Sequence, residues 1–137
     1  MIVGIGIDLV EIERMRLLLE RKGERALARL FTPRERTYAH THPEPARQLA
    51  ARVAAKEATY KALSGNDLAR AIGWREMEVV STKGQAPILV LHGRAQSRAN
   101  ELEVYRVHLS LSHTEHVAVA YVIAERSGTA FPIPISN

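Results

Sequence analysis

Two carboxylates and one lysine in this sequence have the chemistry to bind magnesium and phosphate. Asp8 ends an apolar stretch that begins at Ile2. Glu57 and Lys61 lie at i and i+4 in an alanine-rich stretch typical of a helix. Mg²⁺ usually keeps several waters and takes one or two protein carboxylates together with substrate phosphates. These three residues therefore predict a magnesium–phosphate site, with Lys61 neutralising a phosphate oxygen, if the fold brings them together.

Each of these residues also has a simpler structural interpretation. Asp8 could cap the following helix, with Glu11 three residues later completing a capping box. Glu57 and Lys61 could form an ion pair along the helix worth ~0.2–0.5 kcal/mol. That pair explains the spacing, but not the position of Glu57 at the edge of the apolar stripe of the helix. The stripe consists of Leu49, Val53, Tyr60 and Leu63.

Lys56 falls within the same stripe, because it lies seven residues from both Leu49 and Leu63. A buried charge is costly unless it is paired or bound to a metal. On the opposite, solvent-facing side of the helix we expect Gln48, Arg52 and Thr59.

Other site chemistries find little support in the sequence. It contains no cysteine, which excludes disulfides, zinc–thiolate sites, iron–sulfur clusters and thiol nucleophiles. Residues 113–116 differ from the helical zinc motif HExxH, and there is no Gly-x-Ser-x-Gly elbow. His113 falls at a predicted strand end, where it could meet a ligand.

The residue pattern also predicts the elements that must position these side chains. Together they indicate an α+β fold with a mostly antiparallel sheet packed on one long helix and several short ones. Strands are expected at 2–7, 78–81, 88–91, 104–112 and 116–123, and the long helix at 45–63. Two short helices within 10–30 break near Gly23, and another begins behind Thr32. Gly4 and Gly6 indicate that another backbone or a ligand approaches the first strand closely.

Length and composition predict a single domain over residues 1–126 and a loosely ordered, proline-containing tail over 127–137. No run is long enough for a membrane span, and the first residues do not resemble a secretory signal, so we expect a cytoplasmic protein. The net charge is +4, and residues 14–36 hold eight basic against three acidic side chains. This segment is either a solvated helix face or a docking surface for an acidic partner.

Four stretches, taken in order, resemble the holo-acyl-carrier-protein synthase family, the small bacterial type of 4′-phosphopantetheinyl transferase. They are Gly4–Ile12, Phe31–Glu35, Leu49–Ala62 and His108–His113. The resemblance extends from residue 1 to about residue 126. Its most specific part is the combination of Gly-x-Asp at residues 6–8 with Ala-Lys-Glu-Ala at residues 55–58.

The resemblance implies a 4′-phosphopantetheinyl transferase fold and a Mg²⁺-dependent transfer of 4′-phosphopantetheine from coenzyme A to a serine of acyl carrier protein. It implies that Asp8 and Glu57 bind Mg²⁺ and that Lys61 contacts the diphosphate region of coenzyme A. Either Glu57 or a water on the metal would take the serine proton. The residues that match the nucleotide side are Arg47, His113 and Thr114.

The resemblance also implies a homotrimer with active sites between neighbouring subunits. The arginines that would dock the acidic carrier are Arg14, Arg21 and Arg25. Residues 85–87 read Gln-Ala-Pro where the family commonly has Gly-x-Pro, so the resemblance assigns no role to the 83–87 loop. The alternatives are a non-catalytic coenzyme A-binding member of the same fold and a basic nucleic-acid-binding module, which would lose affinity with salt and not need Mg²⁺.

Overall fold

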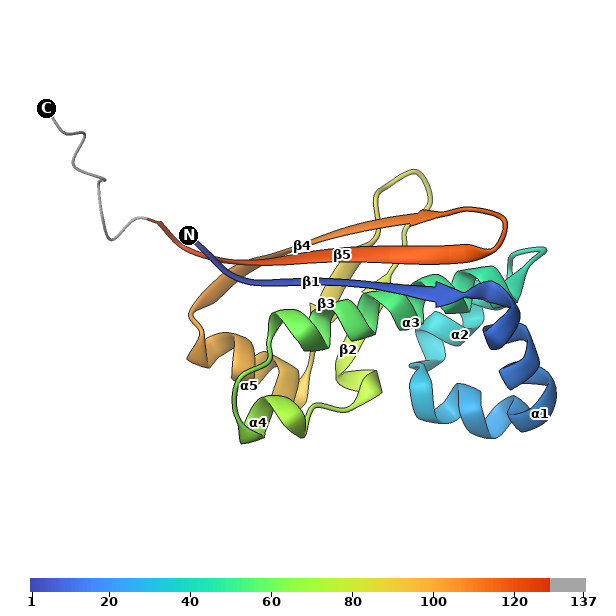
Figure 1. Ribbon diagram of the computed structural model, residues 1–137, viewed down its shortest axis with the longest axis horizontal. Coiled ribbons are helices and arrows are strands. Elements are labelled where there is room, and N and C mark those ends of the chain that lie inside the picture. The colour runs from blue at the N-terminus through green and yellow to red at the C-terminus, as the bar shows by residue number, and fades with distance from the viewer. Residues whose placement is uncertain (129–137) are drawn as a thin grey trace, which may run out of the picture.

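The computed structural model describes residues 1–128 and has an α+β architecture (Figure 1). The strands are β1 (Ile2–Glu11), β2 (Met77–Val80), β3 (Ile88–Leu91), β4 (Val104–His113) and β5 (Val117–Arg126). The helices are α1 (Ile12–Leu30), α2 (Pro33–His40), α3 (Pro45–Ala62), α4 (Asp67–Arg70) and α5 (Gly93–Glu101), and a short 3-10 helix, η1 (Trp74–Glu76), precedes β2.

The larger sheet is antiparallel in the order β1-β5-β4, and α3 crosses one of its faces (Figure 1). A Cβ atom on Gly4 would stand 1.9 Å from the carbonyl oxygen of Ala62, and one on Gly6 would stand 1.7 Å from that of Ala58. The two glycines therefore admit the backbone of α3 and not a ligand. Because side chains alternate along a strand, Asp8 is the next residue on this face.

Small side chains fill the layer between the sheet and α3. Four alanines of the helix share a buried cluster with β5 and β2, namely Ala54, Ala55, Ala58 and Ala62 with Ala120, Val122 and Val79. Alanine lets a helix lie close to a sheet, so residues at the edge of α3 come within reach of β1.

The remaining elements cover the two ends of α3. In Figure 1, α1 and α2 gather around its N-terminal half, while α4 and α5 lie towards its C-terminal end. The antiparallel pair β2-β3 forms the second sheet. None of the helices within residues 1–128 combines the length and the apolar character needed to cross a bilayer.

Several local predictions are confirmed. Gly23 has φ 53° and interrupts α1, so that two helical stretches meet at a kink. Thr32 caps α2 through a full capping box with Glu35. The long helix α3 and the strands β2 and β3 lie where the patterns indicate. The predicted tail falls largely on residues 129–137, which lie outside the described residues.

The proposed capping role of Asp8 is wrong, and so is its place at a strand end. Strand β1 continues to Glu11, because Asp8, Leu9 and Val10 stay paired with β5. Glu11 is the N-cap residue of α1, and its side chain makes no capping bond within the described chain. Asp8 is thus a strand residue that faces a helix, and helix capping does not account for it.

The solvent-facing side expected for α3 is also wrong. Arg52 is 1% exposed and Thr59 is fully buried. The guanidinium of Arg52 lies 4.4 Å from the ring centre of Tyr38 and donates to Ser81 Oγ, while the Thr59 hydroxyl donates to the carbonyl of Ala55. Neighbouring elements cover α3 on more than one side, so a single apolar stripe does not describe its burial.

Candidate functional site

The fold brings Asp8 and Lys61 into direct contact. Nζ of Lys61 lies 3.2 Å from Oδ1 of Asp8 and donates at 2.9 Å to the carbonyl oxygen of Ile7. The Asp8 side chain is 21% exposed and that of Lys61 is 52% exposed. The Lys61 side chain therefore reaches from α3 to β1, and part of the Asp8 carboxylate stays accessible to solvent.

Glu57 lies one turn before Lys61 on the same side of α3 and is half-buried. Burial raises the pKa of the Glu57 carboxyl, and the nearby charge of Asp8 raises this pKa further, against a smaller opposite effect of Lys61. The expected i,i+4 ion pair is thus replaced by a cluster in which Lys61 pairs with Asp8 across two elements. The carboxylates of Asp8 and Glu57, which are far apart in the sequence, repel each other in this cluster.

This carboxylate pair fits a divalent cation. A cation between Asp8 and Glu57 would relieve their repulsion, and carboxylate oxygen is a ligand that Mg²⁺ prefers. Within residues 1–128 no group of three or more metal-ligating side chains is present. A cation held by these two carboxylates would need water or oxygens of a bound substrate to complete its coordination.

Asp8 and Glu57 open into a hollow of about 680 Å³ between β1, α1 and α3. Arg14 and Arg21 of α1 line the same hollow. The carboxylate pair and two of the three arginines expected to dock a partner thus share one concave surface.

A second hollow, of about 270 Å³, shares Glu57 with the first. Its other walls include the aromatic side chains of Tyr60 and Trp74 and the buried Ile72 and Met77. Glu57 stands where an arginine-lined groove meets an aromatic pocket.

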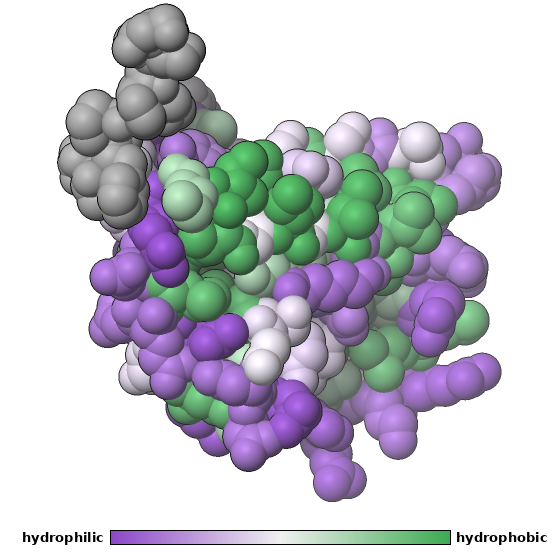
Figure 2. All heavy atoms as spheres, turned by 60° about the vertical axis from the view of Figure 1, so that its left-hand side comes forward, coloured by the Kyte–Doolittle hydropathy of each residue, from purple (hydrophilic) through white to green (hydrophobic). Residues whose placement is uncertain are grey.

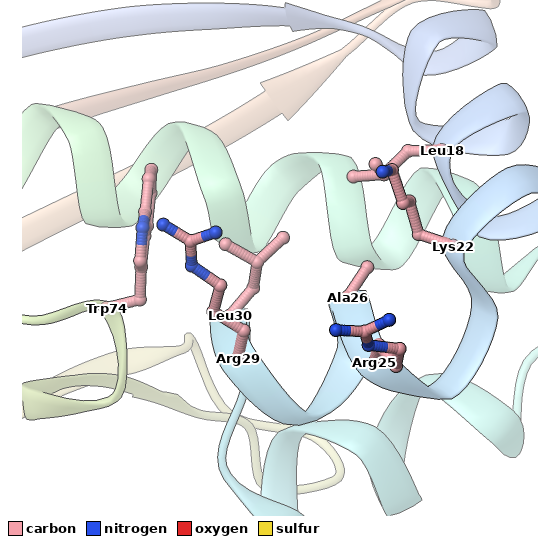
Figure 3. Close-up of a pocket in the computed structure, with 7 residues that line it drawn as sticks. All are labelled: Leu18, Lys22, Arg25, Ala26, Arg29, Leu30 and Trp74. Carbon is pink, nitrogen blue, oxygen red and sulfur yellow. The ribbon is translucent and has the colours of Figure 1, made fainter.

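Figure 3 shows a third hollow, of about 530 Å³, in which cationic side chains surround an apolar floor. The cations are Lys22, Arg25 and Arg29 of α1, and Trp74 closes one end. Trp74 lines both this hollow and the one beside Glu57. The sequence patterns did not single out Arg29 or Trp74, although Trp74 is the sole tryptophan.

Arg47, His113 and Thr114 do not line the hollow of Asp8 and Glu57 within the described chain. Arg47 precedes Glu57 by ten residues, or about 15 Å along the helix, and none of the three lines the hollows described above. His113 is exposed at the end of β4, opposite Ala118 of β5. Nε of Arg47 is buried and meets no acceptor within residues 1–128.

Comparison with known proteins gives consistent matches over nearly the whole chain. The sequence profile of the 4′-phosphopantetheinyl transferase superfamily matches residues 4–122. Holo-[acyl-carrier-protein] synthases of Koribacter versatilis and Anaeromyxobacter dehalogenans are 43% and 46% identical, over 91% and 93% of this chain and 99% of each relative.

Solved structures agree with these sequence matches. The holo-[acyl-carrier-protein] synthase of Neisseria meningitidis superposes with a TM-score of 0.80 at 30% identity, covering 92% of this chain and all (100%) of the other. That of Bacillus anthracis, solved in complex with CoA (3′,5′-ADP), gives 0.73 at 34% identity over 93% of this chain and 99% of the other.

Proposed function

Because this chain belongs to the 4′-phosphopantetheinyl transferase superfamily, we propose that Asp8 and Glu57 hold the Mg²⁺ of its active site. The protein is a transferase that moves 4′-phosphopantetheine from coenzyme A to a serine hydroxyl of acyl carrier protein and releases adenosine 3′,5′-bisphosphate. The observation that carries the site assignment is the cluster of two mutually repelling carboxylates and one lysine where β1 packs on α3.

The side chains of this cluster suit an attack on a phosphoanhydride. The serine oxygen bonds to phosphorus, the hydroxyl proton leaves, and the anhydride P–O bond breaks with its electron pair going to the bisphosphate. Lys61 supplies a cation for the diphosphate oxygens. Either Glu57 itself or a water held beside it would take the serine proton. Bound Mg²⁺ supplies charge neutralisation for the attacked diphosphate.

The two hollows that meet at Glu57 suit the two substrates of the reaction, namely the pantetheine arm of coenzyme A and the acyl carrier protein. The aromatic pocket suits the largely uncharged pantetheine arm, since Tyr60, Ile72, Trp74 and Met77 among its walls offer apolar contacts. The groove with Arg14 and Arg21 fits an acidic carrier and leads to Glu57. Arg25, in the adjoining hollow, extends this cationic surface along α1 (Figure 3).

An assembly of several subunits, which we propose to be a homotrimer, is supported by the outer face of the larger sheet. Hydrophobic side chains gather along it, as Figure 2 shows at the top of the molecule. The exposed hydrophobic side chains on β1 and β5 include Ile5, Ile7, Leu9 and Tyr121, each 39–61% exposed. A continuous apolar surface of this kind is typical of an interface. A neighbouring subunit could then supply Arg47, His113 and Thr114 to the nucleotide, with the unpaired Nε of Arg47 facing a phosphate.

We further place the activity in the cytoplasm and in fatty acid synthesis, where the acyl carrier protein is made functional by this modification. Both assignments rest on the function itself, because coenzyme A is the donor and the carrier is the acceptor.

Mass spectrometry of an apo acyl carrier protein tests the proposal directly. Incubation with this protein, coenzyme A and Mg²⁺ should add one phosphopantetheine group, and a chelator should prevent the addition. Glu57→Gln should abolish the transfer while leaving the circular dichroism spectrum unchanged. Coenzyme A binding without any mass gain would instead identify a non-catalytic member of the fold, and activity retained by Glu57→Gln would contradict the metal assignment.

A further inference from the structure

A fully buried ion pair lies next to Glu57 in the sequence, and the proposed transfer does not use it. Lys56 and Glu35 are each 0% exposed, and Nζ of Lys56 lies 2.8 Å from Oε1 of Glu35. The ring of Phe31, itself buried, lies 5.8 Å from the same Nζ. The pair is enclosed where α2, α3 and the start of β2 meet.

The remaining donors of Lys56 hold backbone of the segment that walls the aromatic pocket. Its Nζ donates at 2.9 Å to the carbonyl oxygen of Trp74 and at 2.6 Å to that of Met77. A lysine ammonium has three N–H groups, so all of them have acceptors. Lys56 thus ties η1 and the first residue of β2 to α3.

Glu35 makes the matching connections on the other side. Its Oε1 accepts from the backbone N–H of Thr32 at 3.0 Å, and its Oε2 accepts from that of Val79 at 2.9 Å. One carboxylate therefore joins the start of α2 to β2 and to the lysine. If α2, α3 or β2 moved relative to the others, a hydrogen bond to one of these two buried charges would break.

Stability by itself does not account for such a pair. Replacing a buried ion pair by apolar side chains of similar volume often leaves stability unchanged or raises it, since two charges must be desolvated. What the pair fixes is position. Lys56 and Glu57 are successive residues of one helix, so anchoring Lys56 sets the rotation at which Glu57 faces Asp8. The same Nζ holds Trp74, which lines two hollows.

We propose that Lys56 and Glu35 are positioning residues for the transfer, which fix the direction of Glu57 towards Asp8 and the place of Trp74 between the aromatic pocket and the carrier groove. This inference rests on the proposed function, because it takes Asp8 and Glu57 as the metal ligands. It goes beyond that function in assigning a role to two side chains that contact no substrate.

The double variant Lys56→Met with Glu35→Gln tests the proposal, because it removes both charges and keeps the side-chain lengths. Trp74 is the sole tryptophan, so its fluorescence reports directly on the wall of the pocket. We expect an altered emission spectrum of the free protein, and Mg²⁺ affinity in the presence of adenosine 3′,5′-bisphosphate weaker by about tenfold or more. The value of kcat should fall at saturating substrates.

The matched control removes another ion pair, one whose arginine is largely buried and also holds backbone near the end of α3. Arg98, 11% exposed in its side chain, pairs with Glu101 and donates to the carbonyls of Leu63 and Ser64 just after α3. Arg98→Met with Glu101→Gln should lower the melting temperature at most. Its Trp74 emission and its Mg²⁺ affinity should match those of the unchanged protein.

Three results would overturn the inference. The first is a folded Lys56/Glu35 double variant with unchanged Trp74 emission and Mg²⁺ affinity, and the second is an equal change in the Arg98/Glu101 control. The third is failure to fold of both the double variant and the milder Glu35→Gln, since the pair would then act through stability. If the unchanged protein itself shows no Mg²⁺ binding that depends on Glu57, the proposed function fails first.

Discussion

At the scale of single residues, the acidity of Glu57 follows from its surroundings. The Glu57 carboxylate is partly buried at the edge of α3, and β1 brings the negative charge of Asp8 close to it. Both effects raise the pKa of Glu57. Glu78 shows the opposite outcome. Burial raises its pKa, but hydrogen bonds from Thr32 (2.5 Å) and His92 (3.0 Å) together outweigh burial, and the pKa lies below its ordinary value. Among the described carboxyls whose pKa departs from its ordinary value, Glu57 is thus the one whose charged form is disfavoured.

The pH dependence of stability should reveal this difference. A carboxyl with a raised pKa adds stability that is complete below its unfolded-state pKa and is lost as pH rises through its folded-state pKa. Without metal, Glu57→Gln should therefore be more stable than the unchanged protein above the raised pKa, and the gap should close on acidification. Urea unfolding at several pH values measures it, and a gap that widens towards acid pH would contradict the assignment.

With Mg²⁺ present, the unchanged protein should be more stable than Glu57→Gln, because metal ligands must be deprotonated and a bound ion stabilises the folded state. The stabilisation by Mg²⁺ should vanish in Glu57→Gln.

At the scale of elements, the distance between β1 and α3 decides whether the carboxylates meet. Gly4 and Gly6 let the strand lie against the carbonyls of Ala62 and Ala58, and Asp8 follows in the same row. The chemistry at Asp8 thus depends on two residues that carry no functional group.

Gly6→Ala should separate these two elements. A methyl group at 1.7 Å from the carbonyl of Ala58 cannot be accommodated without moving backbone, and we expect a loss of about 1–3 kcal/mol in the free energy of unfolding. Asp8 would move away from Glu57, so Mg²⁺-dependent transfer should fall by more than stability explains. Gly84→Ala, in the open β2–β3 connection where a Cβ has no neighbour within 4 Å, is the control for transfer.

Helix α1 is the element that should set the encounter with the carrier. Changing Arg14, Arg21 or Arg25 to Glu should lower the association rate by about tenfold at low salt and flatten its salt dependence, because electrostatic steering acts before contact. Stopped-flow association at several salt concentrations measures both effects. Arg34→Glu, an exposed charge reversal on α2 outside the hollows, should change neither. An unchanged salt dependence in all three α1 variants would remove them from the docking surface.

At the scale of the whole molecule, the residues expected to bind coenzyme A fall in two separate places within the described chain. Asp8 of β1 and Glu57 of α3 line one hollow, whereas Arg47 lies about 15 Å from Glu57 along that helix and His113 lies at the end of β4. If neighbouring subunits complete each other's sites, an inactive variant of the carboxylate pair and an inactive variant at Arg47 should together restore activity when their subunits are mixed.

Mixing Glu57→Gln with Arg47→Ala subunits tests this expectation. After subunit exchange, about a quarter of the sites in random trimers should combine two intact halves, and transfer should reappear. Mixing Glu57→Gln with Asp8→Asn is the control, because both changes fall in the same half. No recovery in a mixture shown by sedimentation to have exchanged would contradict the shared site.

The local order of the chain was predictable because it depends on neighbours in sequence. The kink at Gly23, the capping box of Thr32 and the long alanine-rich helix follow from backbone freedom, side-chain hydrogen bonds and helix propensity. Asp8 and Glu57 were also found as candidates, from residue type and from their place beside apolar residues.

The tertiary structure alone decided what those residues contact. Lys61 has Glu57 one turn away but pairs with Asp8, 53 residues distant, and Arg52 is buried because other elements cover its face of α3. Periodicity describes one face of one helix, whereas burial and charge pairing depend on every element that packs around it. The sequence by itself therefore determined the elements and the chemical inventory of this protein, and packing determined which charges share a site.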